Sequence, residues 1–310
     1  MDIILPGEWL VIGAKSLVGS RFLELSEGSI TAIDSDQLDI TNSQQVEEVL
    51  NEFPGKFVIN FAGMTIVDDI EKTRPKNPSR QEELSQNIAY KVNVLGTRYI
   101  VAACKKLSKF PIFISTGFVF DGKNGPYNED FPVASDPGEV SWYGWTKVLA
   151  EKVVAQAGID YLTVRISYPY RSHYGGKSDF ARNFLNLYDS VQKGEREWYP
   201  IFTDQTLTPT FIDDLPQAIL TLVENETKGI YHITSPAVTT PYEFYCELLK
   251  VARGVENPES LVPKGSLVEF QKSHPTLAKR PLHGGEKTEK IQALDFTPTN
   301  WKEGIKKAFG

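Results

Sequence analysis

The sequence predicts a doubly wound α/β protein built on a parallel sheet. Short apolar runs of the buried-strand type alternate with amphipathic stretches at helical spacing, which is the pattern of βαβ units. A glycine-bracketed turn follows the first of these runs, as in many α/β proteins that bind nucleotides. With 310 residues, 41% of them hydrophobic, the chain can form one large domain or two that share an interface.

The first strand is predicted over residues 9–12, and the turn from Gly13 to Gly19 leads into a helical pattern. Backbone N–H groups in such a turn, together with the positive end of the helix, can approach a pyrophosphate. A tight packing turn without a ligand would show the same glycines. The turn alone therefore leaves both interpretations open.

Acidic residues after the next predicted strand, residues 29–36, favour the nucleotide interpretation. Asp34 follows Gly13 by about 20 residues, the usual distance for a carboxylate that holds the adenosine ribose. Asp39 and Ile40 come next, within reach of an adenine. A carboxylate at residue 34 would also repel a 2′-phosphate, which favours NAD(H) over NADP(H).

Two further buried strands are predicted over residues 57–63 and 110–116, with a long amphipathic helix over 87–107 between them. Ligands of an open parallel sheet bind outside the carboxyl ends of its strands. Ala62 and Thr116 should therefore lie on the same side of the sheet as the glycine turn.

The segment Ser141–Lys147 places Tyr143 and Lys147 four residues apart at the start of a helical pattern, so both side chains should share one helix face. An ammonium group near a phenol lowers the phenol pKa, which would make Tyr143 a general acid. A tyrosine and a lysine at this spacing can also simply cover a helix surface.

The C-terminal part has a different composition. We expect residues 1–168 to form a dinucleotide-binding domain and residues 169–310 to be mainly a substrate-binding α/β region, with about 203–225 packing back on the first domain. Helices are expected over 211–225, after Thr240 as N-cap, and over 299–309. The polar segment 71–86 reads as a surface loop or lid, or as a loop without function.

Several classes of protein are excluded by composition. The net charge of −7 argues against binding to nucleic acid or an anionic membrane. Cys104 and Cys246 form no CxxC pair and the four histidines lack ligand spacing, so no metal site is expected. The N-terminus carries Asp2 and Glu8 and no basic leader, and no run reaches the ~18 apolar residues of a membrane span. A cytoplasmic protein is predicted.

Beyond these patterns, several segments along the chain carry a family resemblance. They are Gly13 to Gly19, NFAGMT at 60–65, Val67-Asp68, Asn93, STGFVFDG at 115–122, YGWTK at 143–147 and RIS at 165–167. In these segments, and in the same order, the chain resembles the extended short-chain dehydrogenase/reductases. Three more segments are DQTLTPTFIDDL at 204–215, GIYHI at 229–233 and KRPLHGGEKTEKIQALDF at 279–296. With them the chain is similar, over nearly its whole length, to the dTDP-4-dehydrorhamnose reductase family of sugar-nucleotide-binding proteins.

The resemblance implies an NAD(P)H-dependent reductase of a nucleotide-linked keto sugar, in which Tyr143 donates a proton, Lys147 binds the ribose and Thr116 hydrogen-bonds the substrate oxygen. The family also implies a homodimer through the helices that carry Asn93 and Tyr143. The implied cofactor-binding residues are Gly13, Ser16, Leu17, Val18, Gly19, Asp34, Asp39, Ile40, Ala62, Gly63, Met64, Thr65, Tyr143 and Lys147. The implied substrate contacts are Thr116, Gly117, Tyr168 and Arg280.

Two alternatives stay open within this resemblance: a sugar-nucleotide epimerase, and a non-catalytic NAD(P)-binding subunit like the beta subunit of methionine adenosyltransferase. Four departures from the reductase pattern lie around the ligands. Ser16 stands where the family has glycine, Gly117-Phe118 replaces Asp-Tyr, Tyr168 replaces a tryptophan, and residues near Lys76 form an insertion. The carboxylate missing after Thr116 also argues against a dehydratase. A substrate diphosphate would have four candidate partners: Arg171, Lys177, Arg182 and Arg280.

Overall fold

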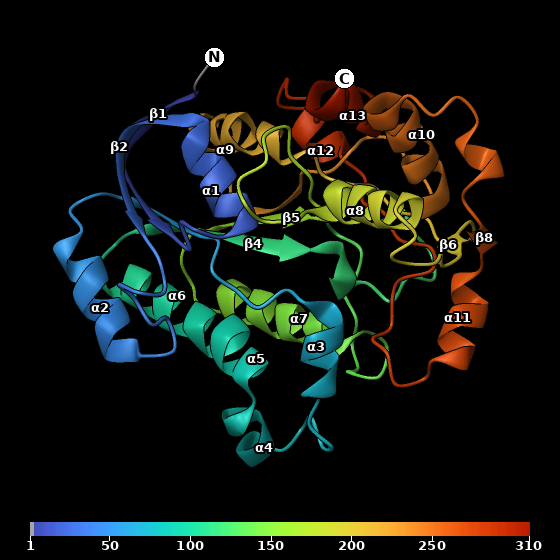
Figure 1. Ribbon diagram of the computed structural model, residues 1–310. Helices are drawn as coiled ribbons and strands as arrows, with labels where there is room; N and C mark the ends of the chain where they lie inside the picture. The colour runs from blue at the N-terminus through green and yellow to red at the C-terminus, as the bar shows by residue number, and fades with distance from the viewer. Residues whose placement is uncertain (1–2) are drawn as a thin grey trace.

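A parallel sheet organises the structure, a computed structural model that describes residues 3–310. Within that range the sheet has six strands in the order β2-β1-β3-β4-β5-β7, and every neighbouring pair is parallel (Figure 1). The strand order reverses beside β1, so the predicted doubly wound α/β fold is confirmed. The strands are β1 (Ile3–Ile12), β2 (Ser26–Ile33), β3 (Phe57–Asn60), β4 (Phe110–Thr116), β5 (Leu162–Ile166) and β7 (Gly229–His232), with β6 (Ile201–Phe202) and β8 (Lys264–Gly265) forming a separate pair.

Helices cover both faces of the sheet (Figure 1). Helices α1 and α9 lie on one face, and α2, α6 and α7 on the other. The α-helices are α1 (Leu17–Glu24), α2 (Ser43–Glu52), α3 (Val67–Lys72), α4 (Gln81–Gln86), α5 (Ile88–Tyr90), α6 (Thr97–Lys106), α7 (Trp142–Ala155), α8 (Phe180–Gln192), α9 (Leu215–Glu224), α10 (Pro241–Arg253), α11 (Leu267–Ser273), α12 (Glu289–Gln292) and α13 (Trp301–Phe309). The short elements are the π-helix η1 (Lys91–Gly96) and the 3-10 turns η2 (Gly117–Val119), η3 (Ile212–Asp214) and η4 (Pro258–Ser260).

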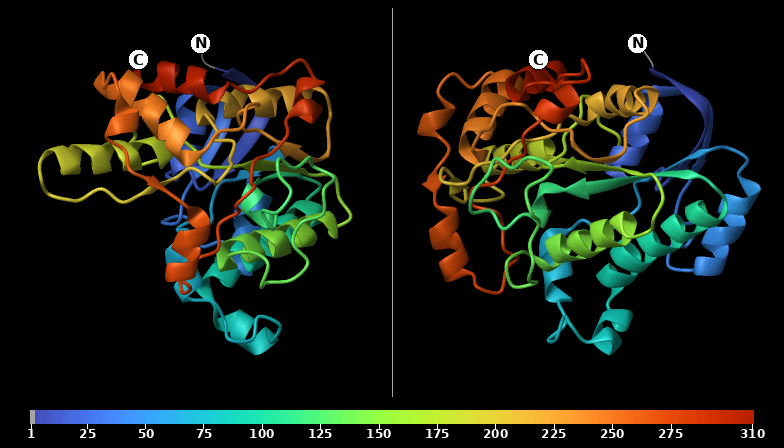
Figure 2. Two further views of the ribbon diagram at one scale, coloured as in Figure 1. Left: turned by 90° about the vertical axis from the view of Figure 1, so that its right-hand side faces the viewer. Right: turned by 180° about the vertical axis from the view of Figure 1, so that it is seen from behind.

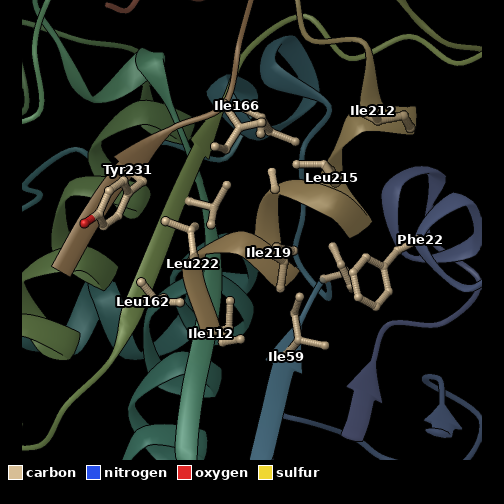
Figure 3. Close-up of a cluster of buried hydrophobic side chains, with 14 of the residues drawn as sticks. Phe22, Ile59, Ile112, Leu162, Ile166, Ile212, Leu215, Ile219, Leu222 and Tyr231 are labelled. Carbon is tan, nitrogen blue, oxygen red and sulfur yellow. The ribbon is translucent and has the colours of Figure 1, made fainter. Parts of the chain in front are cut away.

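The continuous apolar runs of the central strands are explained by this double cover. In β1, Trp9 and Val11 pack in the cluster under α1 and α9, whereas Leu10 and Ile12 pack in the cluster under α2 and α6. Figure 3 shows the first cluster, in which Leu222 of α9 is buried with side chains of the central strands. Since both faces are covered, a strand here needs apolar side chains at every position.

A third cluster holds the C-terminal region together and joins α8, α10 and α13 around aromatic rings such as Phe184 and Phe244. Thr240 caps α10 in a full capping box, as its sequence predicted. The chain returns to the main sheet with α9 and again with β7, so it passes between the two regions more than once. The domain division at residue 168 stays a prediction.

Some predicted boundaries differ from the structure. Residues 81–86 of the supposed loop form helix α4, which projects from the body of the molecule (Figure 2). The helix expected over 87–107 is present, but its middle is the π-helix η1. The first strand is longer than predicted and begins at Ile3; the part of the N-terminal prediction that concerns residues 1–2 lies outside the described residues. Among the helices described for residues 3–310, none has the length and apolar character needed to cross a membrane.

Candidate active site

The glycine turn lies at the carboxyl end of β1, next to the end of β3. Gly13 has φ +80°, and a Cβ on it would lie 2.5 Å from the backbone nitrogen of Ala62. Only glycine combines this left-handed conformation with such a close approach. The turn therefore brings the N-terminus of α1 to the place where the sheet changes direction, which is the usual ligand position in this architecture.

Ser16, the residue that departs from the family glycine, fits the turn without strain. Its φ of −66° and ψ of 163° are ordinary extended values, and its Oγ accepts a hydrogen bond of 2.9 Å from the Gly19 N–H. Ser16 is thus the N-cap of α1. The N–H groups of Leu17 and Val18 lie in the first helical turn, where helix geometry leaves donors available for an anion.

A cavity of about 480 Å³ opens between this turn, the end of β2 and the end of β3. It contains most of the predicted cofactor residues, while Leu17, Val18 and Gly19 lie in the adjoining helix and Thr65 is exposed in the loop after β3. The shape and the donors suit a dinucleotide. The lining residues are Ile12, Gly13, Lys15, Ser16, Asp34, Ser35, Leu38, Asp39, Ile40, Thr41, Ala62, Gly63, Met64, Val92 and Lys177.

Two acidic residues line the end of this cavity beside β2. Asp34 directly follows β2 and lines the cavity together with Asp39. Lys15 also lines it, but its ammonium group forms an ion pair of 2.9 Å with Asp36. The Asp36 carboxylate raises the pKa of Lys15, and the Lys15 ammonium lowers the pKa of Asp36. Carboxylates near a ribose accept its hydroxyl groups and disfavour an added phosphate.

Two other cavities have similar volumes but lie away from the carboxyl ends of the strands. One, of about 580 Å³, lies beside the start of β3 and β4 and is lined by Lys56, Phe57 and Phe110. The other, of about 590 Å³, lies along α10. Because ligands of parallel sheets bind at the opposite ends of the strands, the cavity at Gly13 is the candidate site.

Asn93 connects this cavity to the helix that carries the tyrosine. It is buried in η1, where its Oδ1 accepts the Met64 N–H at 2.9 Å. Its Nδ2 donates to the Met64 carbonyl at 3.1 Å and to Thr146 Oγ1 of α7 at 3.0 Å. A π-helical turn within an α-helix is often found at a functional site. The loop after β3 and helix α7 therefore keep a fixed relation to each other.

Tyr143 and Thr116 are brought together as the sequence predicts. Helix α7 begins at Trp142 with Ser141 as N-cap, and Tyr143 lies in its first turn. The Tyr143 hydroxyl lies near that of Thr116, a buried residue at the carboxyl end of β4, and Thr116 acts to lower the tyrosine pKa. Two hydroxyl groups thus converge beside the sheet, where they can hold a carbonyl oxygen.

Lys147 also faces β4, one helical turn after Tyr143, and its Nζ donates a hydrogen bond of 2.6 Å to the Ile114 carbonyl. Burial lowers the Lys147 pKa to about 8, and the nearby Glu151 carboxylate opposes this shift. Burial raises the Tyr143 pKa to about 12, and the Thr116 hydroxyl opposes this shift. The expectation that Lys147 lowers the tyrosine pKa is therefore wrong in this structure, because its ammonium bonds the β4 backbone.

The predicted substrate residues lie beyond Thr116. Tyr168 adopts φ 46°, a strained conformation for a residue with a large side chain, and its hydroxyl accepts from Gln205 at 3.0 Å. Its ring lies against Phe118, which in turn meets Tyr143. Burial raises the pKa of Tyr168, and the charge of Arg280 opposes this rise. The Arg280 guanidinium itself pairs with Asp68 at 2.6 Å.

The proposed diphosphate partners are used differently. Arg171, which is 1% exposed, hydrogen-bonds Ser20 and pairs with Glu24, so it joins α1 to the segment after β5. Arg182 pairs with Asp179 and is likewise engaged within the protein. Both guanidinium groups form ion pairs within the protein, whereas Arg171 Nε has no hydrogen-bond partner, and their role as diphosphate ligands stays a prediction. Lys177 lines the same cavity as Gly13 and Asp34.

Sequence patterns did not single out two features of the site. Lys15 lies inside the glycine turn and its position could have been noticed from that motif. Glu286 lies 2% exposed against Gly117, and only the GGE sequence in the tail hinted at an unusual position. Within residues 3–310, no group of three or more histidine, cysteine, aspartate or glutamate side chains is arranged to hold a metal ion.

Comparison with known proteins identifies the family. The RmlD substrate binding domain matches residues 8–310. The chain is 28% identical to a dTDP-4-dehydrorhamnose reductase of Aggregatibacter actinomycetemcomitans over 96% of each chain, and 30% identical to a dTDP-4-keto-6-deoxy-D-glucose reductase of Streptomyces niveus over 76% of this chain and 75% of that one. The structure of a dTDP-4-dehydrorhamnose reductase from Bacillus anthracis in complex with NADP superimposes with a TM-score of 0.79, at 25% identity and 98% coverage of both chains. The resemblance predicted from the sequence is thereby confirmed: the chain belongs to the RmlD substrate binding domain family.

Proposed function

We propose that this protein is an NAD(P)H-dependent reductase of a dTDP-linked 4-keto-6-deoxy sugar. The observation that carries the proposal is the meeting of Tyr143 and Thr116 at the carboxyl end of β4, with Lys147 one turn away and the dinucleotide cavity linked to the same helix by Asn93. The family relatives named above include reductases of such sugars.

The residues around the cavity fit a nicotinamide dinucleotide. The turn after Gly13 and the first N–H groups of α1 would hold the pyrophosphate, and Asp34 would accept the adenosine ribose hydroxyls. When bound in its reduced form, the cofactor supplies a hydride for the ketone carbon. Side chains of the protein would supply the proton and the hydrogen bonds to the ketone oxygen.

Those side chains manage the charge that develops on the ketone oxygen. Tyr143, protonated at neutral pH because its pKa is about 12, gives its proton to that oxygen. An alkoxide is a stronger base than a phenolate, so the transfer runs toward the substrate. Thr116 donates a hydrogen bond to the same oxygen. The ammonium group of Lys147 would bind the nicotinamide ribose, as the family resemblance implies.

The proposal is tested by mixing the purified protein with NADH or NADPH and a panel of nucleotide-linked 4-keto sugars while following the absorbance of the reduced cofactor. We expect oxidation with a dTDP-linked 4-keto-6-deoxyhexose. No oxidation with any sugar, despite measurable cofactor binding, would instead favour a regulatory subunit. The predicted homodimer and cytoplasmic location remain predictions.

Replacing Tyr143 with phenylalanine removes the proton donor and keeps the ring that packs against Phe118. We expect kcat to fall by on the order of 10²–10⁴-fold while the dissociation constant of the cofactor stays near the wild-type value. A Tyr99→Phe variant on α6, outside the candidate cofactor cavity, serves as the matched control. A Tyr143→Phe enzyme with normal turnover would remove the tyrosine from the mechanism.

The pH dependence follows from the two shifted groups. Lys147, with a pKa of about 8, is charged at neutral pH and loses its charge as the pH rises, whereas Tyr143 keeps its proton until about pH 12. We therefore expect kcat/KM for reduction to fall as the pH rises through about 8, since this parameter reports groups of the enzyme before the substrate binds. Titration of the ¹⁵N-labelled Lys147 ammonium by NMR assigns the transition, and a midpoint near pH 10.5 would contradict it.

The acidic end of the cavity predicts a preference for NADH. Asp34 would repel a 2′-phosphate, and Lys15 is held by Asp36, so NADH should bind about tenfold more tightly than NADPH, a difference of about 1.4 kcal/mol. Asp34→Asn should narrow this ratio, while Asp160→Asn on the opposite side of the sheet should leave it unchanged. Titration of both dinucleotides decides the question, and tighter binding of NADPH by the wild type would overturn the preference.

A further inference from the structure

A buried carboxylate lies directly against the turn that carries Thr116. The Glu286 side chain accepts hydrogen bonds from the hydroxyl groups of Ser167, at the end of β5, and Thr208, the latter at 2.6 Å. The Gly117 N–H points to the same group, and it also donates to Ser167 Oγ at 3.2 Å. Burial raises the pKa of Glu286, and the hydrogen bonds from Ser167 and Thr208 together with the Arg165 charge oppose this shift. Such a network fixes a carboxylate firmly, because each of its oxygens has a donor.

The Glu286 carboxylate occupies the space that a side chain on Gly117 would need. A Cβ on Gly117 would lie 1.8 Å from Glu286 Oε1 and 2.8 Å from Ser167 Oγ. The backbone of Gly117 does not require glycine, since it is not among the residues with positive φ. Glycine is needed at this position because the carboxylate fills the space of a side chain.

The segment that carries Glu286 is held by the main chain. The Lys287 N–H donates to the Tyr127 carbonyl at 2.7 Å, and the Gly125 N–H donates to the His283 carbonyl at 3.0 Å. On its other side, the Thr206 N–H donates to the Leu282 carbonyl at 2.8 Å. Backbone hydrogen bonds on both sides of Glu286 therefore fix the main chain from which its carboxylate projects.

The opposite side of the same turn is clamped by α7. A Cβ on Gly144 would lie 2.2 Å from the Phe118 carbonyl oxygen, so helix and turn are in close contact one residue after Tyr143. Thr116 caps the turn by accepting the Phe118 N–H at 3.3 Å. Turn η2 is thus held between α7 and Glu286, and a small tilt would move the Thr116 hydroxyl relative to that of Tyr143.

From this arrangement we infer that Glu286 is a positioning residue for Thr116, supplying from the C-terminal segment the carboxylate that locks the catalytic turn. The expected effect on kcat rests on the proposed function. The contact between Glu286 and the turn is a feature of the structure alone. A misplacement of about 1 Å at a reacting group can reduce the rate on the order of 10²-fold.

The test uses five variants of the full chain. Glu286→Gln keeps the shape and removes the charge, so we expect kcat to fall on the order of 10²-fold with the cofactor dissociation constant unchanged. Glu289→Gln, an exposed glutamate at the start of α12, is the matched control and should behave as wild type. Gly117→Asp should be harmful alone, because its side chain meets Glu286, yet should raise kcat when introduced into Glu286→Ala, where it returns a carboxylate to the vacated volume.

A second readout does not depend on activity. Hydrogen–deuterium exchange of the peptide that covers residues 112–120 should rise in Glu286→Gln and Glu286→Ala, and should fall again in the double variant, while exchange at residues 13–19 stays constant. Wild-type kcat in Glu286→Gln, unchanged exchange, or equal damage by Gly117→Asp in both backgrounds would each overturn the inference. If the wild type oxidises no cofactor with any sugar, the proposed function fails, and the exchange result still decides whether Glu286 holds the turn.

Discussion

The site depends on the three hydrogen bonds that Asn93 makes from the π-helical turn η1. They fix the Met64 peptide, which borders the dinucleotide cavity, relative to Thr146 on the helix that presents the tyrosine. A buried amide with its donors and acceptor satisfied specifies one geometry, since any displacement leaves a polar group unpaired. The candidate cofactor cavity and the proposed proton donor Tyr143 come from segments far apart in the chain, and the hydrogen bonds of Asn93 link the two segments.

A second polar layer supports Thr116 from beneath. Ser115 donates to Glu151 of α7 at 2.5 Å, and Glu151 forms two hydrogen bonds, of 2.9 and 2.7 Å, with Arg165 of β5. Arg165 also lies beside His232, whose pKa falls to about 3, so that ring is neutral. The buried charges are therefore paired, and they join β4, β5 and α7 under the catalytic turn. Pairing of this kind gives specificity of geometry more than net stability.

The sequence was sufficient for the fold class, the family and the convergence of Tyr143 with Thr116, because each follows from periodicity or from the position of a residue at a strand end. It was insufficient for the pKa of Tyr143, which depends on how deeply the ring is buried and on where the Lys147 ammonium points. It also did not indicate that Arg171 pairs with Glu24, since a guanidinium suits phosphate and carboxylate equally well. Contacts between distant segments, such as Glu286 with Gly117, leave no periodic trace.

Burial shifts the pKa values of Tyr143 and Lys147 in opposite directions, and in both residues the shift is toward the uncharged form. It raises the pKa of Tyr143 and lowers that of Lys147, so both neutral forms are favoured. A neutral phenol is the form that a reductase needs, because the reaction consumes a proton at the ketone oxygen. An oxidising enzyme would need the phenolate as a base, and at a pKa of about 12 that form is scarce at neutral pH. In the proposed mechanism, the burial of Tyr143 therefore favours the protonated phenol, which is the form that reduction of a ketone requires.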